Sequence, residues 1–197
     1  GNDGDDGDDG DDGGDVVTPP AQSADKFTDF SKTKYTWAYD AVDKLVKEGV
    51  IEGKDEKTFD PEGTTTNAEF VAMVIRAMGI ETEDVASGEH WAKNIIAAAK
   101  EKGLLDYTTS FESDGKITRE EMFTILYKAL LASSKTLEKG EVSEFTDAAS
   151  ISDFAKEATG ALIKAGIVNG MGDGTVAPKG TATRAQVATV IFRAFFK

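Results

Sequence analysis

The chain has 197 residues, of which 40% are hydrophobic and 29% charged, and its formal net charge is -14. It has no cysteine and one histidine, His90, which excludes disulfides, thiol nucleophiles and metal sites built from cysteine or several histidines. The acidic balance attracts neither nucleic acid nor an anionic membrane, and no apolar run reaches the roughly 20 residues that a membrane-spanning helix needs.

Residues 1–22 consist of Asp and Gly in a near-triplet repeat, followed by a Pro pair. Eight Asp and no Lys or Arg fall within residues 1–15, so the rest of the chain carries a net charge of only -6. This composition predicts a disordered, extended linker, with loose Ca²⁺ binding as the alternative. We expect an effector or scaffold domain before this linker, and the start at Gly without a signal peptide fits an excised or mature product.

A repeated unit begins at Phe-Thr-Asp, residues 27–29. Trp37, Ala41 and Leu45 recur at helical spacing, and Gly49 supplies the usual left-handed C-terminus of such a helix. A loop then leads to Thr-Asn-Ala-Glu at 66–69, where Thr followed three residues later by Glu is a capping box that predicts a helix over about 67–78. The first unit therefore covers residues 27–79.

The same order recurs twice, over residues 84–132 and 145–197. Trp91 and Phe154 open the first helical pattern of these units, and Gly103 and Gly166 end it. The capping boxes are Thr-Arg-Glu-Glu at 118–121 and Thr-Arg-Ala-Gln at 183–186, which predict helices over about 119–131 and 184–196. Gly and boxed Thr are 17 residues apart in the first and third units and 15 in the second.

A unit of roughly 50 residues buries too little surface to be stable alone, so the three units should share one core. The sequence predicts a single compact all-α domain over residues 23–197, with pseudo-threefold helix-loop-helix repeats. The long loops hold Gly, Asp, aromatic and Pro residues, and we expect them to be ordered and to point into grooves between the units.

Arg119 and Arg184 stand at the first helical position after the boxed Thr, where unpaired N–H groups and the helix dipole already make a positive end. An anion held jointly by the guanidinium and these N–H groups is one interpretation, and a salt bridge within the protein is the other. The first unit has Asn67 at this position and lacks the charge.

Other candidates have a structural alternative. Trp37 and Trp91 lie on apolar faces, which favours a core role over stacking on a sugar. Asp173, Gly170 and Gly174 could approach a sugar closely or simply form an Asp-Gly turn. For Met171 packing is favoured over lining a groove, and for His90 a capping or surface role is favoured over catalysis.

The ordered motifs resemble the S-layer homology (SLH) module. In the first unit the resemblance rests on Gly-Val-Ile-Glu-Gly at 49–53 and Thr-Phe-Asp-Pro at 58–61. In the third it rests on Gly-Ile-Val-Asn-Gly-Met-Gly-Asp-Gly-Thr at 166–175, Pro178 and the box at 183–186. Tandem triplets are the usual arrangement in this family, and its hallmark is Thr-Arg-Ala-Glu.

The resemblance implies a non-catalytic, extracellular module without cofactors that anchors a surface protein to the bacterial cell wall or S-layer. Its expected partner is secondary cell-wall polysaccharide, whose terminal pyruvate ketal places one carboxylate on the motif Arg between neighbouring repeats. We rank the three sites Arg184, Arg119, Asn67. The residues expected to bind ligand are Arg184, Arg119, Thr183, Thr118, Gly170, Met171, Asp173, Gly174, Trp37, Trp91 and, as a degenerate site, Asn67.

Two other function classes remain open at this stage. Residues 110–121 overlay an EF-hand loop through Glu112, Asp114, Gly115 and Glu121, although Ser110 stands where the pattern has Asp, so a calcium-dependent or protein–protein module is the alternative. A glycoside hydrolase would need paired carboxylates, and no motif here sets such a pair apart.

Overall fold

The structure, a computed structural model, describes residues 22–197, and within that range it is helical, without a strand or sheet. The predicted linker, residues 1–22, lies outside the described residues except for Gln22. The elements are η1 (Ala24–Lys26), α1 (Thr36–Lys47), α2 (Asn67–Ala77), α3 (Lys93–Glu101), α4 (Arg119–Ala132), η2 (Ala148–Ser150), α5 (Asp153–Lys164) and α6 (Arg184–Phe195).

The three capping boxes begin α2, α4 and α6, as the sequence predicts. The side chains of Thr66, Thr118 and Thr183 each accept a hydrogen bond from the backbone N–H three residues later. The Glu or Gln at that third position accepts in return from the backbone N–H of the Thr. Each box thus satisfies N–H groups that the helix itself leaves unpaired.

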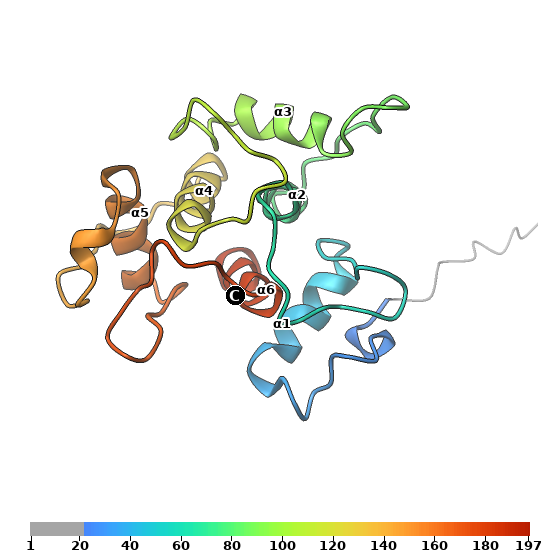
Figure 1. The fold of residues 1–197 in the computed structure, drawn as a ribbon, viewed down its shortest axis with the longest axis horizontal. Coiled ribbons are helices and arrows are strands. Elements are labelled where there is room, and N and C mark those ends of the chain that lie inside the picture. Colours follow the sequence, from blue (N-terminus) through green and yellow to red (C-terminus); the bar gives the residue numbers. More distant parts are fainter. Residues whose placement is uncertain (1–21) are drawn as a thin grey trace, which may run out of the picture.

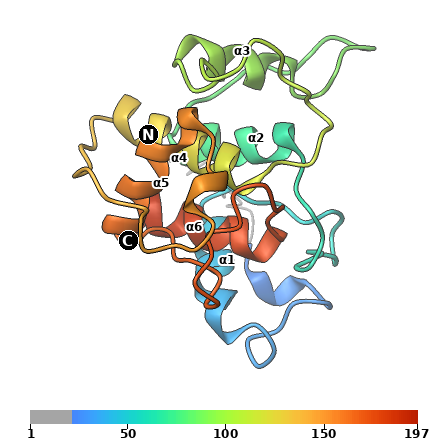
Figure 2. The same ribbon diagram turned by 60° about the vertical axis from the view of Figure 1, so that its left-hand side comes forward.

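The box helices α2, α4 and α6 contact one another at the centre, and α1, α3 and α5 surround them (Figure 1). Each outer helix packs mainly on the box helix of the preceding unit: α3 on α2, α5 on α4 and α1 on α6. Figure 2 shows the same interleaving from another side. Since every unit completes the core of its neighbour, the three form one all-α body with a common hydrophobic core.

Loops close the arrangement into a ring. The backbone N–H of Asn67 donates to Gly115 O of the second unit, and that of Arg119 donates to Gly180 O of the third unit. The N–H of Arg184 donates to Gly63 O of the first unit, which joins the end of the chain to its beginning. Each box helix therefore begins against the loop of the next unit. A threefold ring requires this connectivity, although the symmetry itself stays a prediction.

The Phe-Thr-Asp motif orders the loops of the first and third units. The carboxylate of Asp29 accepts from the backbone N–H groups of Phe59 and Asp60, both at 2.8 Å. Asp147 does the same for Val176 at 2.9 Å and Ala177 at 2.8 Å. These two loops are therefore ordered, as expected, because one carboxylate fixes the turn before α2 and another the turn before α6.

The expected core role of the tryptophans is wrong. Trp37 and Trp91 are 56% and 48% exposed, whereas the alanines that follow them, Ala38 and Ala92, are fully buried. At both points the alanine side chain therefore faces the core, and the indole lies on the surface. Helix α3 also begins at Lys93, so Trp91 precedes it.

Candidate functional site

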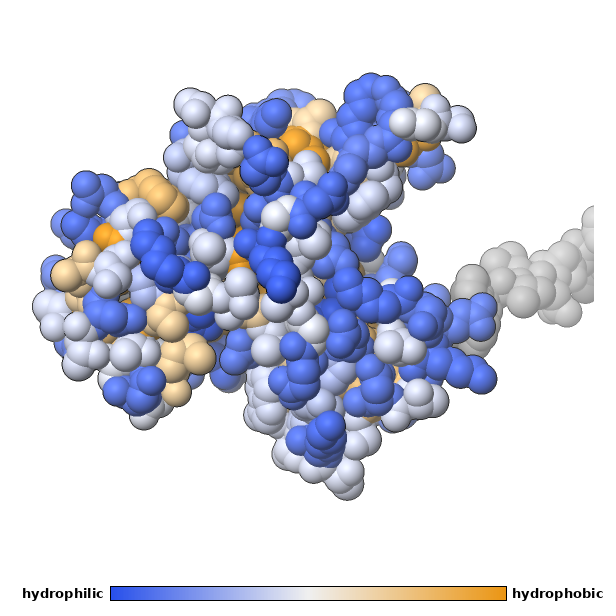
Figure 3. All heavy atoms as spheres, in the orientation of Figure 1, coloured by the Kyte–Doolittle hydropathy of each residue, from blue (hydrophilic) through white to orange (hydrophobic). Residues whose placement is uncertain are grey.

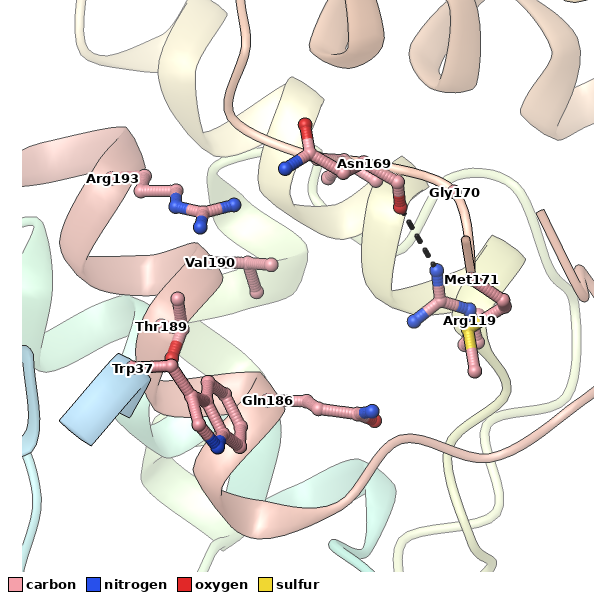
Figure 4. Close-up of a pocket in the computed structure, with 10 residues that line it drawn as sticks. Trp37, Arg119, Asn169, Gly170, Met171, Gln186, Thr189, Val190 and Arg193 are labelled. Atoms are coloured by element: carbon pink, nitrogen blue, oxygen red, sulfur yellow. Dashed lines mark hydrogen bonds between the residues drawn. The ribbon is translucent and has the colours of Figure 1, made fainter. Parts of the chain in front are cut away.

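A hollow of about 200 Å³ lies beside the buried Arg119 and is shown in Figure 4. We call it the Arg119 groove. Its lining residues are Trp37, Arg119, Val168, Asn169, Gly170, Met171, Gln186, Thr189, Val190 and Arg193. Three units build it: Arg119 comes from the second, the loop and α6 from the third, and Trp37 from the first. Figure 4 shows Gln186 extending from α6 between Trp37 and Arg119.

Arg119 is held by backbone carbonyls rather than by a carboxylate. It is 5% exposed, its Nε donates to Val176 O at 2.8 Å and its Nη2 to Asn169 O at 3.5 Å. Burial lowers the pKa of this guanidinium from its ordinary value, but an arginine stays charged at neutral pH. Because the third-unit loop fixes the guanidinium through carbonyl groups, and no carboxylate of the described residues forms an ion pair with it, the arginine can still receive an anion.

A second hollow, of about 420 Å³, surrounds Arg184. We call it the Arg184 groove, and its lining residues are Val50, Ile51, Glu52, Gly53, Lys54, Glu69, Ala72, Met73, Arg76, Trp91 and Arg184. It repeats the design of the first groove one unit further on. Arg184 comes from the third unit, the loop and α2 from the first, and Trp91 from the second.

Arg184 is likewise tied to a backbone carbonyl. Its Nη2 donates to Glu52 O, its side chain lies over the Phe59 ring, and it is 4% exposed. Its Nε is buried with no hydrogen-bond partner among the described residues. The alternative of a salt bridge that locks the arginine deep in the fold therefore does not describe this site, because a groove reaches it.

The expected contribution of free helix N–H groups is wrong. In all three box helices the first two N–H groups donate to carbonyls of the next unit's loop. Those of Arg184 and Ala185, for example, donate to Gly63 O and Pro61 O. The boxed Thr takes the third N–H. An anion in either groove would thus meet the guanidinium rather than the backbone of the helix start.

The two grooves differ in charge. Each groove has a second guanidinium, that of Arg193 beside Arg119 and that of Arg76 beside Arg184, but no carboxylate is among the residues that line the Arg119 groove. In the Arg184 groove Lys54 forms an ion pair with Glu69. The charges of Glu69, Asp60 and Glu52 all act on Arg184, whereas Asp147 is the one carboxylate that acts appreciably on Arg119. Charge therefore favours Arg119 over Arg184 as an anion site, the reverse of the order ranked from the sequence.

The third position of the ring lacks the charge and differs from the two grooves in its side chains. The amide nitrogen of Asn67 donates to Glu112 O at 2.9 Å in place of a guanidinium. Tyr107 stands four residues after Gly103, the place that Gly53 and Gly170 occupy in the other loops. Its ring stacks on Phe154, the counterpart of the groove tryptophans, with centroids 5.1 Å apart. At the site that the sequence marks as degenerate, two stacked aromatic rings thus stand where the open grooves have a glycine and a tryptophan.

Of the other residues predicted to bind ligand, some line a groove and others have structural roles. Met171, expected to pack, is 46% exposed and lines the Arg119 groove. Gly170 also lines it, but a Cβ there would lie 2.7 Å from Phe145, so packing already requires glycine. Asp173 accepts from the Thr175 N–H at 2.9 Å, and Gly174 has φ +84°, so both form a turn. Thr118 and Thr183 serve as helix caps.

Sequence reasoning missed several lining residues on the box helices, namely Gln186, Arg193 and Arg76. The available signal was register: the two arginines follow the boxed Thr by the same interval, and so do Glu69 and Gln186. Residues seven positions apart on a helix share a face, so Gln186 and Arg193, like Glu69 and Arg76, lie along one side of their groove.

The EF-hand-like stretch and His90 form hydrogen bonds with neighbouring residues. The Glu121 carboxylate of the EF-hand-like stretch accepts from the N–H and hydroxyl of Thr118, as a capping box requires. Among residues 22–197 no group of three or more His, Asp or Glu side chains could hold a metal ion. His90 Nδ1 accepts from the Ala92 N–H at 3.1 Å and its Nε2 lies 3.2 Å from Asp114 Oδ1, so it has a local surface role and does not cap α3.

Comparison with known proteins gives consistent results. The S-layer homology domain family matches residues 26–71 and 144–188, which overlap the first and third units. The chain is 36% identical over 189 residues to Exoglucanase XynX of Acetivibrio thermocellus, covering 88% of this chain and 17% of that protein. It is 37% identical over 179 residues to Amylopullulanase of Thermoanaerobacterium thermosulfurigenes, covering 83% and 9%.

A further relative is S-layer protein sap of Bacillus anthracis, 30% identical over 183 residues, which covers 89% of this chain and 22% of that protein. The chain therefore spans less than a quarter of the length of each of these relatives. Within residues 22–197, no helix is both long enough and apolar enough to cross a membrane.

Proposed function

Because this chain belongs to the S-layer homology family, whose members are found at the cell surface and cell wall, we propose that it anchors its parent protein by binding a carboxylate-bearing sugar at the terminus of secondary cell-wall polysaccharide. The pyruvate ketal of the family's usual ligand supplies that carboxylate. The observation that carries the proposal is a buried Arg119, hydrogen-bonded only to backbone carbonyls among the described residues, at the wall of a groove that also presents an exposed Trp37.

The groove chemistry suits such a ligand. A guanidinium donates two parallel hydrogen bonds to a carboxylate, and the fixed position of Arg119 means that little side-chain entropy is lost on binding. Val190 and Met171 offer apolar surface to the methyl group of a ketal. An exposed indole such as that of Trp37 can cover the apolar face of a sugar ring. Arg193 adds a second positive charge at the groove.

We propose that the module itself is not an enzyme. A glycosidase needs two carboxylates about 5–10 Å apart around the scissile bond, and none lines the Arg119 groove. Two relatives are named for glycan-degrading activities, but the chain matches 17% of one and 9% of the other. By analogy with them, we propose that an effector or scaffold domain is joined through the Asp/Gly-rich segment.

The test is binding of purified pyruvylated polysaccharide to the chain and to Arg119→Ala. Loss of a charge-assisted hydrogen bond to the carboxylate should weaken binding by about 1.5–3 kcal/mol. Because Arg119 also holds a loop, Arg193→Gln serves as a milder variant that should weaken binding in the same direction, since Arg193 makes only a 3.4 Å contact to Ile167 O. Calorimetric titration gives the affinities, and thermal unfolding verifies that each variant is folded.

The matched control is Asn67→Ala, which changes the same helix position at the third site and should leave the affinity unaltered. Polymer whose ketal has been removed by mild acid should bind poorly to every variant. Full binding by folded Arg119→Ala and Arg193→Gln, or undiminished binding of the stripped polymer, would refute the proposal.

A further inference from the structure

Gln186 and Glu69 have the same helix-capping role, and each lies beside a different groove. Each is the third residue of its box helix and closes the capping box by accepting from a Thr N–H, at 3.0 Å for Gln186 and 2.9 Å for Glu69. Each also lines the groove in front of its helix. The two side chains have nearly the same shape and differ by one unit of negative charge.

The side-chain atoms that the caps leave unused differ in how they would interact with an anion. The cap uses the amide oxygen of Gln186, so the end of the side chain that remains is a hydrogen-bond donor. The cap uses one carboxylate oxygen of Glu69, and the other accepts from Lys54. A carboxylate has no donor to offer, so Glu69 adds negative charge to its groove while Gln186 adds none.

We propose that this capping-box residue is the specificity determinant of each groove, so that the Arg119 groove is the strong anion site and the Arg184 groove the weak one. This inference rests on the function proposed above, and it assigns to the box residue a role in ligand recognition besides helix capping. The chain thereby carries two grooves of the same design but different affinity.

The charges around the two arginines support this assignment. In the Arg184 groove, the negative charge of Glu69 attracts Arg184 and repels a bound carboxylate. The Glu69 side chain is 22% exposed and lies in the groove wall. The Lys54 partner offsets only part of that field, because exposed ion pairs are screened by water and salt. In the Arg119 groove the equivalent positions are Met171 and Gln186, and the ligand meets no competing carboxylate.

Two variants exchange the box residues of the two grooves, and with them the difference in charge, while keeping an acceptor for each helix cap. Gln186→Glu keeps an acceptor for the Thr183 N–H and should weaken the Arg119 groove roughly 3- to 10-fold, as expected for like charges several ångström apart in partly screened surroundings. Glu69→Gln should strengthen the Arg184 groove by a similar factor. Glu121→Gln is the matched control, because it makes the same change at the third position and should alter neither groove.

The chain itself supplies a reporter for each groove. Its two tryptophans, Trp37 and Trp91, line the Arg119 and Arg184 grooves respectively. The ¹⁵N–¹H indole signals, assigned with Trp37→Phe, can be followed during titration with the methyl glycoside of pyruvate-ketalated N-acetylmannosamine, the type of sugar that the family resemblance implies. The unketalated glycoside is the blank. In the wild type we expect the Trp37 signal to shift at several-fold lower ligand concentration than the Trp91 signal.

The outcomes separate this inference from the proposed function. Binding that depends on the ketal and is lost at the Trp37 signal in Arg119→Ala, yet is unaffected by Gln186→Glu and Glu69→Gln, would overturn the role of the box residue while sustaining the anchoring function. Equal wild-type affinities at the two indoles would overturn it as well. If neither indole responds to the ketalated sugar, the proposed function fails and the inference fails with it.

Discussion

At the residue scale, one loop position decides whether a groove is open. Four residues after the glycine that ends each outer helix stand Gly53, Tyr107 and Gly170. In the first and third units a Cβ at this position would lie 2.5 Å from Phe27 and 2.7 Å from Phe145. The glycines therefore let the loop lie directly on the aromatic ring of the Phe-Thr-Asp motif. The second unit places Tyr107 there instead, against Phe154.

Gly170→Ala should lower the free energy of unfolding by about 1–3 kcal/mol, the range for forcing an extra methyl group into a packed site. The added carbon would meet both Phe145 and the Thr175 carbonyl oxygen at 2.7 Å, and the backbone oxygen cannot move aside as a flexible side chain would. Urea unfolding followed by circular dichroism measures the change. Met171→Ala is the neighbouring control: it is 46% exposed, so a change beyond about 0.5 kcal/mol would be unexpected. Unchanged stability of Gly170→Ala would contradict the packing argument.

The sequence identifies the arginines but not their surroundings. Arg119 and Arg184 stand out because a capping box gives them a helix position without any structure. Their guanidinium groups contact carbonyls of the next unit's loop. These contacts depend on how the ring closes, which no local sequence pattern encodes. The exposure of Trp37 and Trp91 was missed for a similar reason, since helical periodicity cannot tell an inward Ala38 from an inward Trp37.

At the element scale, capping boxes predict the starts of α2, α4 and α6 to the residue, because their signal is local hydrogen bonding. The outer helices are less exactly predicted: neither α1 nor α3 has a side-chain N-cap, and α3 begins two residues after Trp91. Their position is set by packing on the box helix of the preceding unit, which is tertiary information.

Asp43 of α1 forms hydrogen bonds to the start of η1, the segment that precedes α1. This carboxylate accepts from the Ser23 hydroxyl at 2.9 Å, the Ala24 N–H at 3.1 Å and Lys47 Nζ at 2.6 Å. Burial alone would raise the pKa of Asp43, but the hydrogen bonds from Lys47, Ala24 and Ser23 outweigh it, and the pKa lies below its ordinary value. Asp43 therefore stabilises the fold when it is ionised.

Asp43→Asn should lower the free energy of unfolding at pH 7 by about 1–2 kcal/mol, through weakened hydrogen bonds to η1 and Lys47. Since the folded pKa is depressed, this contribution is present above the ordinary pKa of aspartate and disappears as the pH falls through the folded value. Unfolding of both proteins between pH 7 and pH 2 should show the gap closing only in the acidic part. A gap that stays constant to the lowest pH, or widens there, would show that the charge of Asp43 is not its source.

At the scale of the whole molecule, the grooves exist only because the units interleave. Each open groove takes its arginine from one unit, its loop and box helix from the next, and its tryptophan from the one after that. The N–H of Arg184 closes the ring on Gly63 of the first unit. The all-α fold and the repeats follow from the sequence, but the direction of closure, and with it the loop that faces each arginine, does not. Figure 3 shows one mostly hydrophilic face of the resulting body, with its apolar residues scattered.

This composite design predicts two working sites per chain rather than three. Calorimetric titration with the ketalated methyl glycoside should fit two sites, because Asn67 brings no charge to the third and we expect the Tyr107–Phe154 stack to cover it. Arg119→Ala and Arg184→Ala should each remove one site, and the double variant both. Tyr107→Gly combined with Asn67→Arg restores the residue types of the open grooves and should add a third. Three sites in the wild type would mean that the aromatic stack opens readily, and the covering role assigned to Tyr107 would then be wrong.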